Sequence, residues 1–153
     1  MIMKKAIDKA RLNMNKNYGG PFGACIVDKD GEIVACASNT VLKDNDPTAH
    51  AEINVIREAC KKLNTRDLSD YILYTTCYPC PMCLGAIIWA NITEVFYGCK
   101  KEDAANIGFR DDYIYNFIAD NCLDKKVLKL SEINRDECLK LFEEYSSNKK
   151  EIY

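Results

Sequence analysis

The 153-residue sequence lacks several features that would assign it to particular classes of protein. No apolar run is long enough to span a bilayer, and residues 1–8 lack the apolar stretch of a secretion signal. Basic residues are not in excess, since the formal net charge is −2 and acidic residues flank the lysine pairs at 100–101, 125–126 and 149–150. Nucleic-acid-binding proteins usually carry a basic surplus. We therefore expect a small-molecule substrate, no nucleic acid and no membrane as partners.

Internal repeats, low-complexity segments and linkers are also absent, and the length suits one domain, residues 1–153, with a sizeable core. Nine cysteines without a secretion signal predict a reducing compartment, the cytoplasm, rather than a disulfide framework. Histidine is the scarcest metal-binding residue, because His50 is the only one. A metal site in this chain must therefore combine one imidazole with other donors.

Cysteines suited to that role follow in the segment Pro79-Cys80-Pro81-Met82-Cys83. Zinc binds imidazole nitrogen and thiolate sulfur tetrahedrally, and catalytic sites use three protein ligands and leave the fourth position to water. Glu52, two residues after His50, is positioned to move protons at that open position. His50, Cys80 and Cys83 with Glu52 have the ligand set and spacing of a zinc-dependent deaminase of bases or nucleosides. We expect one Zn²⁺ per chain.

Three other interpretations compete. Cys77 could be a fourth ligand and make the zinc site structural, as in a zinc-binding interaction module. The Cys77, Cys80 and Cys83 run also suggests an iron–sulfur cluster, but Ile87 stands where the bacterial pattern requires another cysteine. Finally, the cysteines could be buried thiols in a core.

Hydrophobic periodicity predicts alternating helices and strands. Helices are expected around Met3–Met14, after Thr48, over Cys83–Ala90 and Asp112–Ala119, and from a cap at Asn134 to about Ser146. Strands are expected at 22–27 and 32–37, which form a hairpin, and at 71–76, 94–98 and 127–130. This order predicts a three-layer α/β/α fold with a central mixed five-stranded sheet. Both metal motifs then begin helices beside strand ends, where open α/β sheets place ligands.

With these residues in view, the chain resembles the cytidine deaminase-like superfamily, in its branch of guanine, cytosine and tRNA adenosine deaminases. The resemblance rests on Gly20-Pro21-Phe22-Gly23-Ala24, on residues 46–52 and on residues 79–86. Residues 103–105, 108–115 and 148–153 are similar to bacterial guanine deaminases. That family implies hydrolysis of guanine to xanthine and ammonia.

The resemblance also implies roles for individual residues. Zinc binds His50, Cys80 and Cys83, and Glu52 shuttles protons. Asn39 hydrogen-bonds the purine, and Asp111 contacts the guanine amino group and assists its departure. The carboxy-terminal segment, about 131–153, crosses to the partner of a homodimer, so that Tyr153 closes the neighbour's pocket. The tail departs from the family pattern, because Lys150-Glu151-Ile152-Tyr153 carries an added isoleucine where the family ends in Lys-Glu-Tyr.

Each of these positions also has a plainer interpretation. Asn39 could form a turn and Asp111 could cap a helix, with Asp112 as the alternative carboxylate. Phe22 could wall the pocket or belong to the core. Backbone N–H groups near Ala51 could orient the ring. Cytosine deaminase and tRNA adenosine deaminase remain rivals on the same zinc core.

Overall fold

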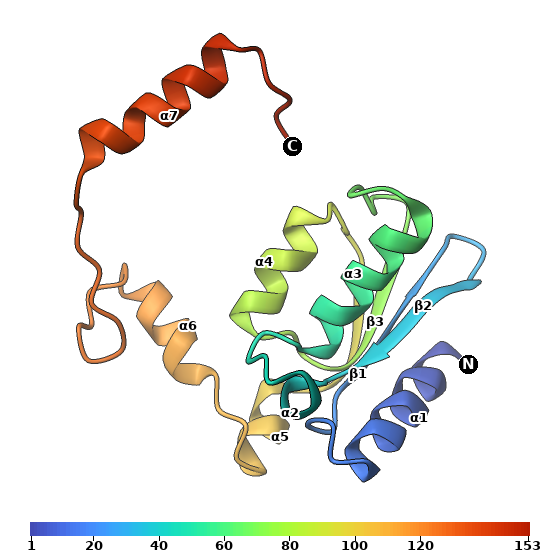
Figure 1. Cartoon of the computed structure of the whole chain (residues 1–153). Helices are drawn as coiled ribbons and strands as arrows, with labels where there is room; N and C mark the ends of the chain where they lie inside the picture. The colour runs from blue at the N-terminus through green and yellow to red at the C-terminus, as the bar shows by residue number, and fades with distance from the viewer. The chain divides into compact units, whose positions relative to one another are not determined.

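A computed structural model describes all residues, Met1–Tyr153, and divides the chain into two compact units, Met1–Asp112 and Tyr113–Tyr153. The first unit holds the sheet and the helices that cover it (Figure 1). The second unit consists of helices α6 (Asp112–Ala119) and α7 (Arg135–Ser147) with the segments around them. None of the helices is both long and apolar enough to cross a membrane.

The first unit is built on a mixed sheet of four strands in the order β2-β1-β3-β4. The strands are β1 (Gly23–Val27), β2 (Ile33–Ser38), β3 (Ile72–Cys77) and β4 (Val95–Cys99). β1 pairs antiparallel with both β2 and β3, whereas β3 and β4 are parallel. The predicted hairpin and the partly parallel sheet are therefore confirmed.

The prediction of a fifth strand at 127–130 is wrong, because this segment is irregular. It lies in the second unit, which contains no strand with which it could pair. An extended segment needs a neighbour for its N–H and C=O groups, and apolar side chains alone do not supply one. Val127, Leu128 and Leu130 are accordingly exposed.

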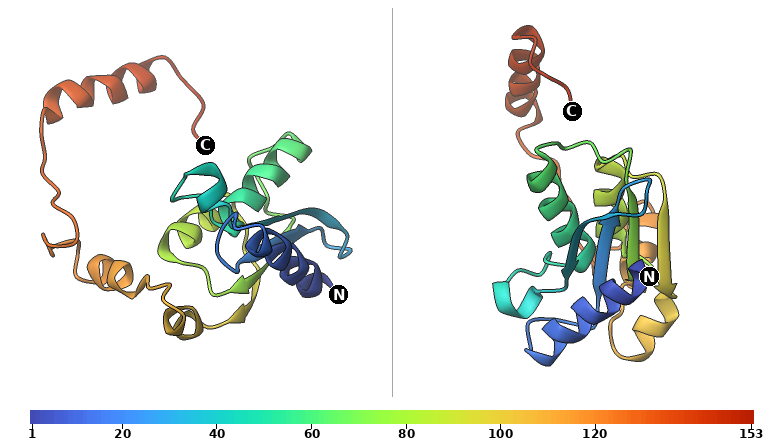
Figure 2. Two further views of the ribbon diagram at one scale, coloured as in Figure 1. Left: turned by 60° about the horizontal axis from the view of Figure 1, so that its bottom comes forward. Right: turned by 90° about the vertical axis from the view of Figure 1, so that its right-hand side faces the viewer.

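Helices pack on both faces of the sheet, as the three-layer prediction requires. One face carries α3 (Ala51–Leu63) and α4 (Pro81–Trp89), which lie side by side in Figure 1. α1 (Ile2–Asn15) packs against β1 and β2 on the other face (Figure 2). All five residues of β1 are buried, because this central strand is covered on both sides. The short helices α2 (Val41–Asp44) and α5 (Lys101–Asn106) complete the unit.

The hydrophobic core fills the layer between the sheet and α3. Small residues on α3 allow the helix to approach the sheet closely, and larger side chains from the strands occupy the remaining space. The cluster includes Ala24, Ile26, Ala51, Val55, Ala59, Leu68, Leu73 and Ile87. This packing fixes the amino terminus of α3, where the metal motif begins.

One disulfide joins Cys25 of β1 to Cys36 of β2, which are direct partners in the antiparallel register with Cα atoms 4.1 Å apart. The other seven cysteines are unpaired. This pair was not predicted, because two cysteines that are eleven residues apart in sequence meet only across the folded hairpin.

Candidate active site

Two helix N-termini bring the predicted metal ligands together. His50 is the N-cap of α3 and Cys80 is the N-cap of α4, both with extended backbone conformations. Pro81 occupies the first turn of α4, where a missing N–H is tolerated. Thr48, directly after which we expected this helix to begin, instead forms a turn in which its N–H and hydroxyl donate to Asp46 at 2.8 and 2.7 Å. The helix therefore begins two residues later than predicted, at the metal motif itself.

The donor atoms of His50, Cys80 and Cys83 all lie within 4.8 Å of one another. His50 Nδ1 is 3.5 Å from Cys80 Sγ and 3.6 Å from Cys83 Sγ. A tetrahedral zinc centre, with Zn–N of about 2.0–2.1 Å and Zn–S of about 2.3 Å, separates such ligands by roughly 3.5 Å. One imidazole and two thiols at these separations fit Zn²⁺. The donor geometry therefore agrees with the predicted zinc cofactor.

Hydrogen bonds among the three donors shift the pKa of each of them. A hydrogen bond from Cys83 and a second from His50 lower the pKa of Cys80 to about 4, although burial opposes this shift. The hydrogen bond to Cys80, followed by burial, raises the pKa of Cys83. The hydrogen bond to Cys80 also raises the pKa of His50, against the effect of burial. These shifts favour the thiolate form of Cys80, which is the form of cysteine that binds a metal ion.

Cys77 is not part of this cluster. Its thiol donates to the carbonyl of Lys100 at 3.6 Å, and burial raises its pKa to about 11. Its Sγ is not among the donor atoms that lie within 4.8 Å of one another, which come from His50, Cys80 and Cys83 alone. Three donors are therefore gathered here, the number of protein ligands that catalytic rather than structural zinc sites use.

Glu52 lies directly beside the donors and is buried, with 6% of its surface exposed. Its Oε1 accepts a hydrogen bond from Thr75 at 2.8 Å, and its Oε2 lies 3.5 Å from Cys83 Sγ. Burial raises the pKa of this carboxyl, although the hydrogen bond from Thr75 opposes the shift. A buried carboxyl with a raised pKa, fixed beside an open metal position, has the properties of a general acid–base group.

Asn39 lies in the loop between β2 and α2 and is 5% exposed. Its Oδ1 accepts hydrogen bonds from the N–H groups of Gly20 at 3.2 Å and Val41 at 3.1 Å. Its own N–H donates to the carbonyl of Phe22 at 3.0 Å. Because the carbonyl end of the side chain is used by the backbone, the NH₂ end is the one left to bind a ligand.

Phe22 is half-buried and packs edge-to-face against Phe109, with ring centroids 4.9 Å apart. This contact anchors the segment that carries Asp111 close to β1. Burial, followed by the charge of Cys80, raises the pKa of Asp111. Asp112 is different, because hydrogen bonds from Arg110 lower its pKa and hold its carboxylate at 2.8 and 3.2 Å.

The two remaining predicted site residues, Ala51 and Tyr153, lie in different units of the chain. Ala51 is fully buried and is the first residue of α3, where helix N–H groups have no intrahelical partner. Tyr153 is 82% exposed and belongs to the second unit.

Three residues that support the site were not predicted from the sequence: Thr75, Phe109 and Asn54. Thr75 sits in an alternating strand, where a threonine carries no special signal. Phe109 lies in a segment whose similarity was noted, but its contact with Phe22 depends on tertiary packing.

Comparisons with known proteins agree with this geometry. The family described as the cytidine and deoxycytidylate deaminase zinc-binding region matches residues 1–99. A guanine deaminase of Bacillus subtilis (strain 168) is 47% identical over 152 residues, which cover 98% of this chain and 96% of the relative. A tRNA-specific adenosine deaminase of Buchnera aphidicola is 35% identical over 131 residues, covering 85% and 82%.

The fold is shared as well. The X-ray structure of guanine deaminase from Bacillus subtilis superposes with a TM-score of 0.91 at 45% identity, covering 99% of this chain and 97% of that one. The family and fold class expected from the sequence are thereby confirmed. The chain belongs to the family of deaminases that share the cytidine and deoxycytidylate deaminase zinc-binding region.

Proposed function

We propose that this protein is a zinc-dependent guanine deaminase that hydrolyses guanine to xanthine and ammonia. The observation that carries the proposal is the similarity to a guanine deaminase over nearly the whole length of both chains. That similarity includes the region beyond residue 99, where the shared zinc-binding segment ends. The buried Glu52 beside three metal donors supplies the chemistry that hydrolytic deamination requires.

His50, Cys80 and Cys83 hold the zinc ion. When bound, zinc lowers the pKa of a water molecule and so supplies hydroxide near neutral pH. Glu52 takes the proton of the attacking water and passes it to the ring nitrogen beside C2 of guanine. Its fixed position supports this role, because Thr75 holds one oxygen and leaves the other directed toward the metal ligands.

Asp111 contacts the guanine amino group and assists the departure of ammonia. Its half-buried carboxyl and raised pKa support a role in proton donation. Asp112 is a weaker candidate, because Arg110 neutralises it at an exposed position. Asn39 donates its NH₂ group to an acceptor on the purine, and Phe22 forms a wall of the pocket. The N–H group of Ala51 orients the ring.

The protein acts as a homodimer in which each carboxy-terminal segment completes the partner's site through Tyr153. Support comes from the second unit, because α7 has no buried residue. Large apolar side chains are exposed on α7, including Leu141 and Phe142, and Ile152 is exposed in the tail that follows it. On α4, Ile88 and Trp89 are 70% and 76% exposed. Apolar surface of this extent is typical of contacts between subunits.

Seven of the nine cysteines are unpaired, which is consistent with residence in the reducing cytoplasm.

A substrate panel tests the proposal. Ammonia release from guanine, cytosine, adenine and guanosine is compared for wild type, Glu52→Gln and Glu58→Gln. We expect wild type to favour guanine and Glu52→Gln to lose at least about a hundredfold in kcat, since general acid–base groups contribute on the order of a hundredfold to ten-thousandfold. Glu58 is an exposed carboxylate on the same helix and serves as the matched control. Turnover of another base but not guanine would refute the proposal.

Adenosine deamination in tRNA is a second candidate, favoured by the similarity to the Buchnera aphidicola enzyme. The net charge of −2 opposes it, because a polyanionic substrate calls for a basic surface. A tRNA substrate added to the same panel decides between the two.

A further inference from the structure

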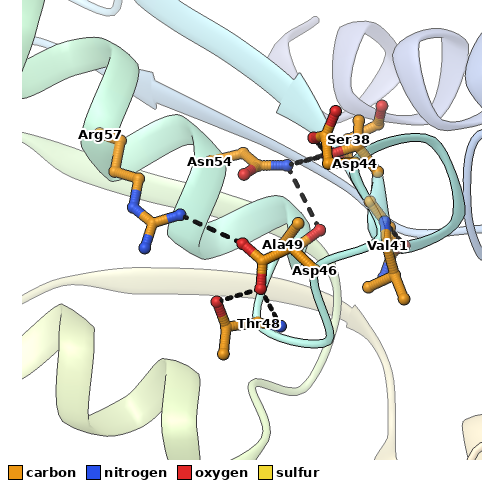
Figure 3. Close-up of polar contacts among 10 residues, drawn as sticks. Ser38, Val41, Asp44, Asp46, Thr48, Ala49, Asn54 and Arg57 are labelled. Carbon is orange, nitrogen blue, oxygen red and sulfur yellow. Dashed lines mark hydrogen bonds and ion pairs between the residues drawn. The ribbon is translucent and has the colours of Figure 1, made fainter.

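A hydrogen-bond network surrounds the start of α3, and the side-chain amide of Asn54 lies at its centre (Figure 3). Asn54 Nδ2 donates to the carbonyl of Ser38 at 2.9 Å and to the carbonyl of Ala49 at 3.3 Å. It also donates at 2.9 Å to the hydroxyl of Thr40, which in turn donates to Asp44 at 2.6 Å. One side chain on α3 thus holds both the end of β2 and the segment that precedes α3.

The three acceptors belong to residues that are adjacent in sequence to two residues of the site. Ser38 and Thr40 are the chain neighbours of Asn39, and Ala49 is the neighbour of His50. A backbone hydrogen bond of 3.0 Å from Thr40 N–H to the Ala49 carbonyl joins the same two segments. The amide therefore fixes the position of the Asn39 peptide relative to the helix that carries the metal ligand.

The orientation of Asn39 depends on this placement. Its Oδ1 is held by the N–H groups of Gly20 and Val41. Val41 directly follows Thr40, whose hydroxyl accepts a hydrogen bond from Asn54. If the loop moves, the N–H group of Val41 moves with it and Asn39 loses one of the two bonds that set its rotamer. A side chain held by two directional bonds presents its remaining NH₂ group in one direction.

We propose that Asn54 is a positioning residue, which holds Asn39 in the orientation that recognises the base. This inference rests on the proposed function, since the role of Asn39 toward the substrate is part of it. Asn54 does not touch the base or the metal and acts through Asn39. Its amide is suited to the task because its two N–H groups satisfy acceptors in two different segments.

Asn54→Ala should raise the KM for guanine roughly tenfold while kcat and the zinc content change little, because a misplaced hydrogen-bond donor weakens binding. Asn39→Ala should have a similar effect. If Asn54 acts through Asn39, the double variant should be no worse than Asn39→Ala alone, whereas independent sites give additive effects. Additive losses in kcat/KM would overturn the proposal.

Amide hydrogen exchange supplies a readout that does not depend on turnover. Exchange at the N–H groups of Gly20 and Val41 should become about tenfold faster in Asn54→Ala, because both donate to Asn39. Unchanged exchange would overturn the positioning role even if guanine is the substrate. A wild-type protein that releases no ammonia from guanine would instead refute the proposed function.

Two further variants distinguish a positioning role of Asn54 from a general loss of folding. Asn54→Leu removes the donors at similar size and without leaving a cavity, so its KM should match that of Asn54→Ala if folding is not the cause. Arg57→Ala is the matched control on the same helix. The ion pair of Arg57 with Asp46 is exposed and long, at 3.9 Å, so its loss should leave KM within about twofold of wild type. A normal KM in Asn54→Leu would refute the inference.

Discussion

Gly19 gives a direct test of how tightly the Asn39 loop is packed. A Cβ atom at this buried position would lie 2.2 Å from Asn39 Oδ1 and 2.4 Å from the Asn39 carbonyl oxygen. Contacts below 3.0 Å force a shift, and here one of the clashing groups is backbone, which cannot swing away like a side-chain end. Gly19→Ala should therefore displace Asn39 from the position set by Gly20 and Val41.

The magnitude follows from the overpacking. Inserting a methyl group into a filled space typically destabilises a protein by about 1–3 kcal/mol, which corresponds to a fall in melting temperature of about 2–12 °C at this chain length. If the displacement removes the hydrogen bond from Asn39 to the base, a loss of similar size appears in the transition-state free energy. That loss lowers kcat/KM for guanine about 5- to 150-fold. Zinc content should stay at one ion per chain.

Gly85 provides the matched control, because a Cβ atom there would meet nothing within 4 Å. It lies inside α4, where alanine is favoured over glycine by roughly 0.5–1 kcal/mol. Gly85→Ala should therefore keep its activity and melt slightly higher than wild type. Steady-state kinetics, zinc analysis and thermal unfolding measure all three quantities on both variants. A Gly19→Ala variant with kcat/KM within twofold of wild type would refute the packing argument.

The remaining predictions concern the carboxylates, the spare thiol and the tail. Asp111→Asn should lower guanine turnover at least about tenfold without loss of zinc, and Asp112→Asn should change it little, as steady-state kinetics will show. Cys77→Ala should retain one zinc per chain by metal analysis. Deleting residues 152–153 should weaken guanine deamination but not zinc binding. Mixing that truncated chain with Glu52→Gln should restore activity if tails are exchanged, because each mixed dimer then holds one complete site; mixtures that stay inactive would argue against exchange.

Much of the fold could be predicted because the signals are local. The polar segment 28–31 between two apolar runs predicted the β1–β2 hairpin, and Asp112–Ala119 was predicted with the bounds that α6 has. Asn134 is the N-cap of α7, as expected. The helix α5 was missed although it carries a local signal, since the Asp103 carboxylate accepts a 2.8 Å hydrogen bond from the N–H of Lys100 at the helix start.

The residues of the candidate site likewise include some with a local sequence signal and some without one. His50, Cys80 and Cys83 could be predicted because metal ligands are rare residue types at a recognisable spacing, and a helix start fixes where each side chain points. The contact between Phe22 and Phe109 joins positions that are far apart in sequence, and neither phenylalanine differs from an ordinary core residue until the chain is folded. Partners of this kind depend on tertiary packing, which no local pattern reports.

Two adjacent residues of β3, Thr75 and Thr76, use their hydroxyl groups in different contacts. Thr75 projects toward α3 and donates to Glu52, whereas the hydroxyl of Thr76 accepts a 3.1 Å hydrogen bond from the N–H of Gly23. Successive side chains of a strand point to opposite faces, so a shift of one residue in the register of β3 would turn Thr75 away from Glu52. Removing the Thr75 hydroxyl from the buried carboxyl costs about 1–3 kcal/mol. The register that packs Leu73 into the core is therefore also the register that supports the proton-transfer group.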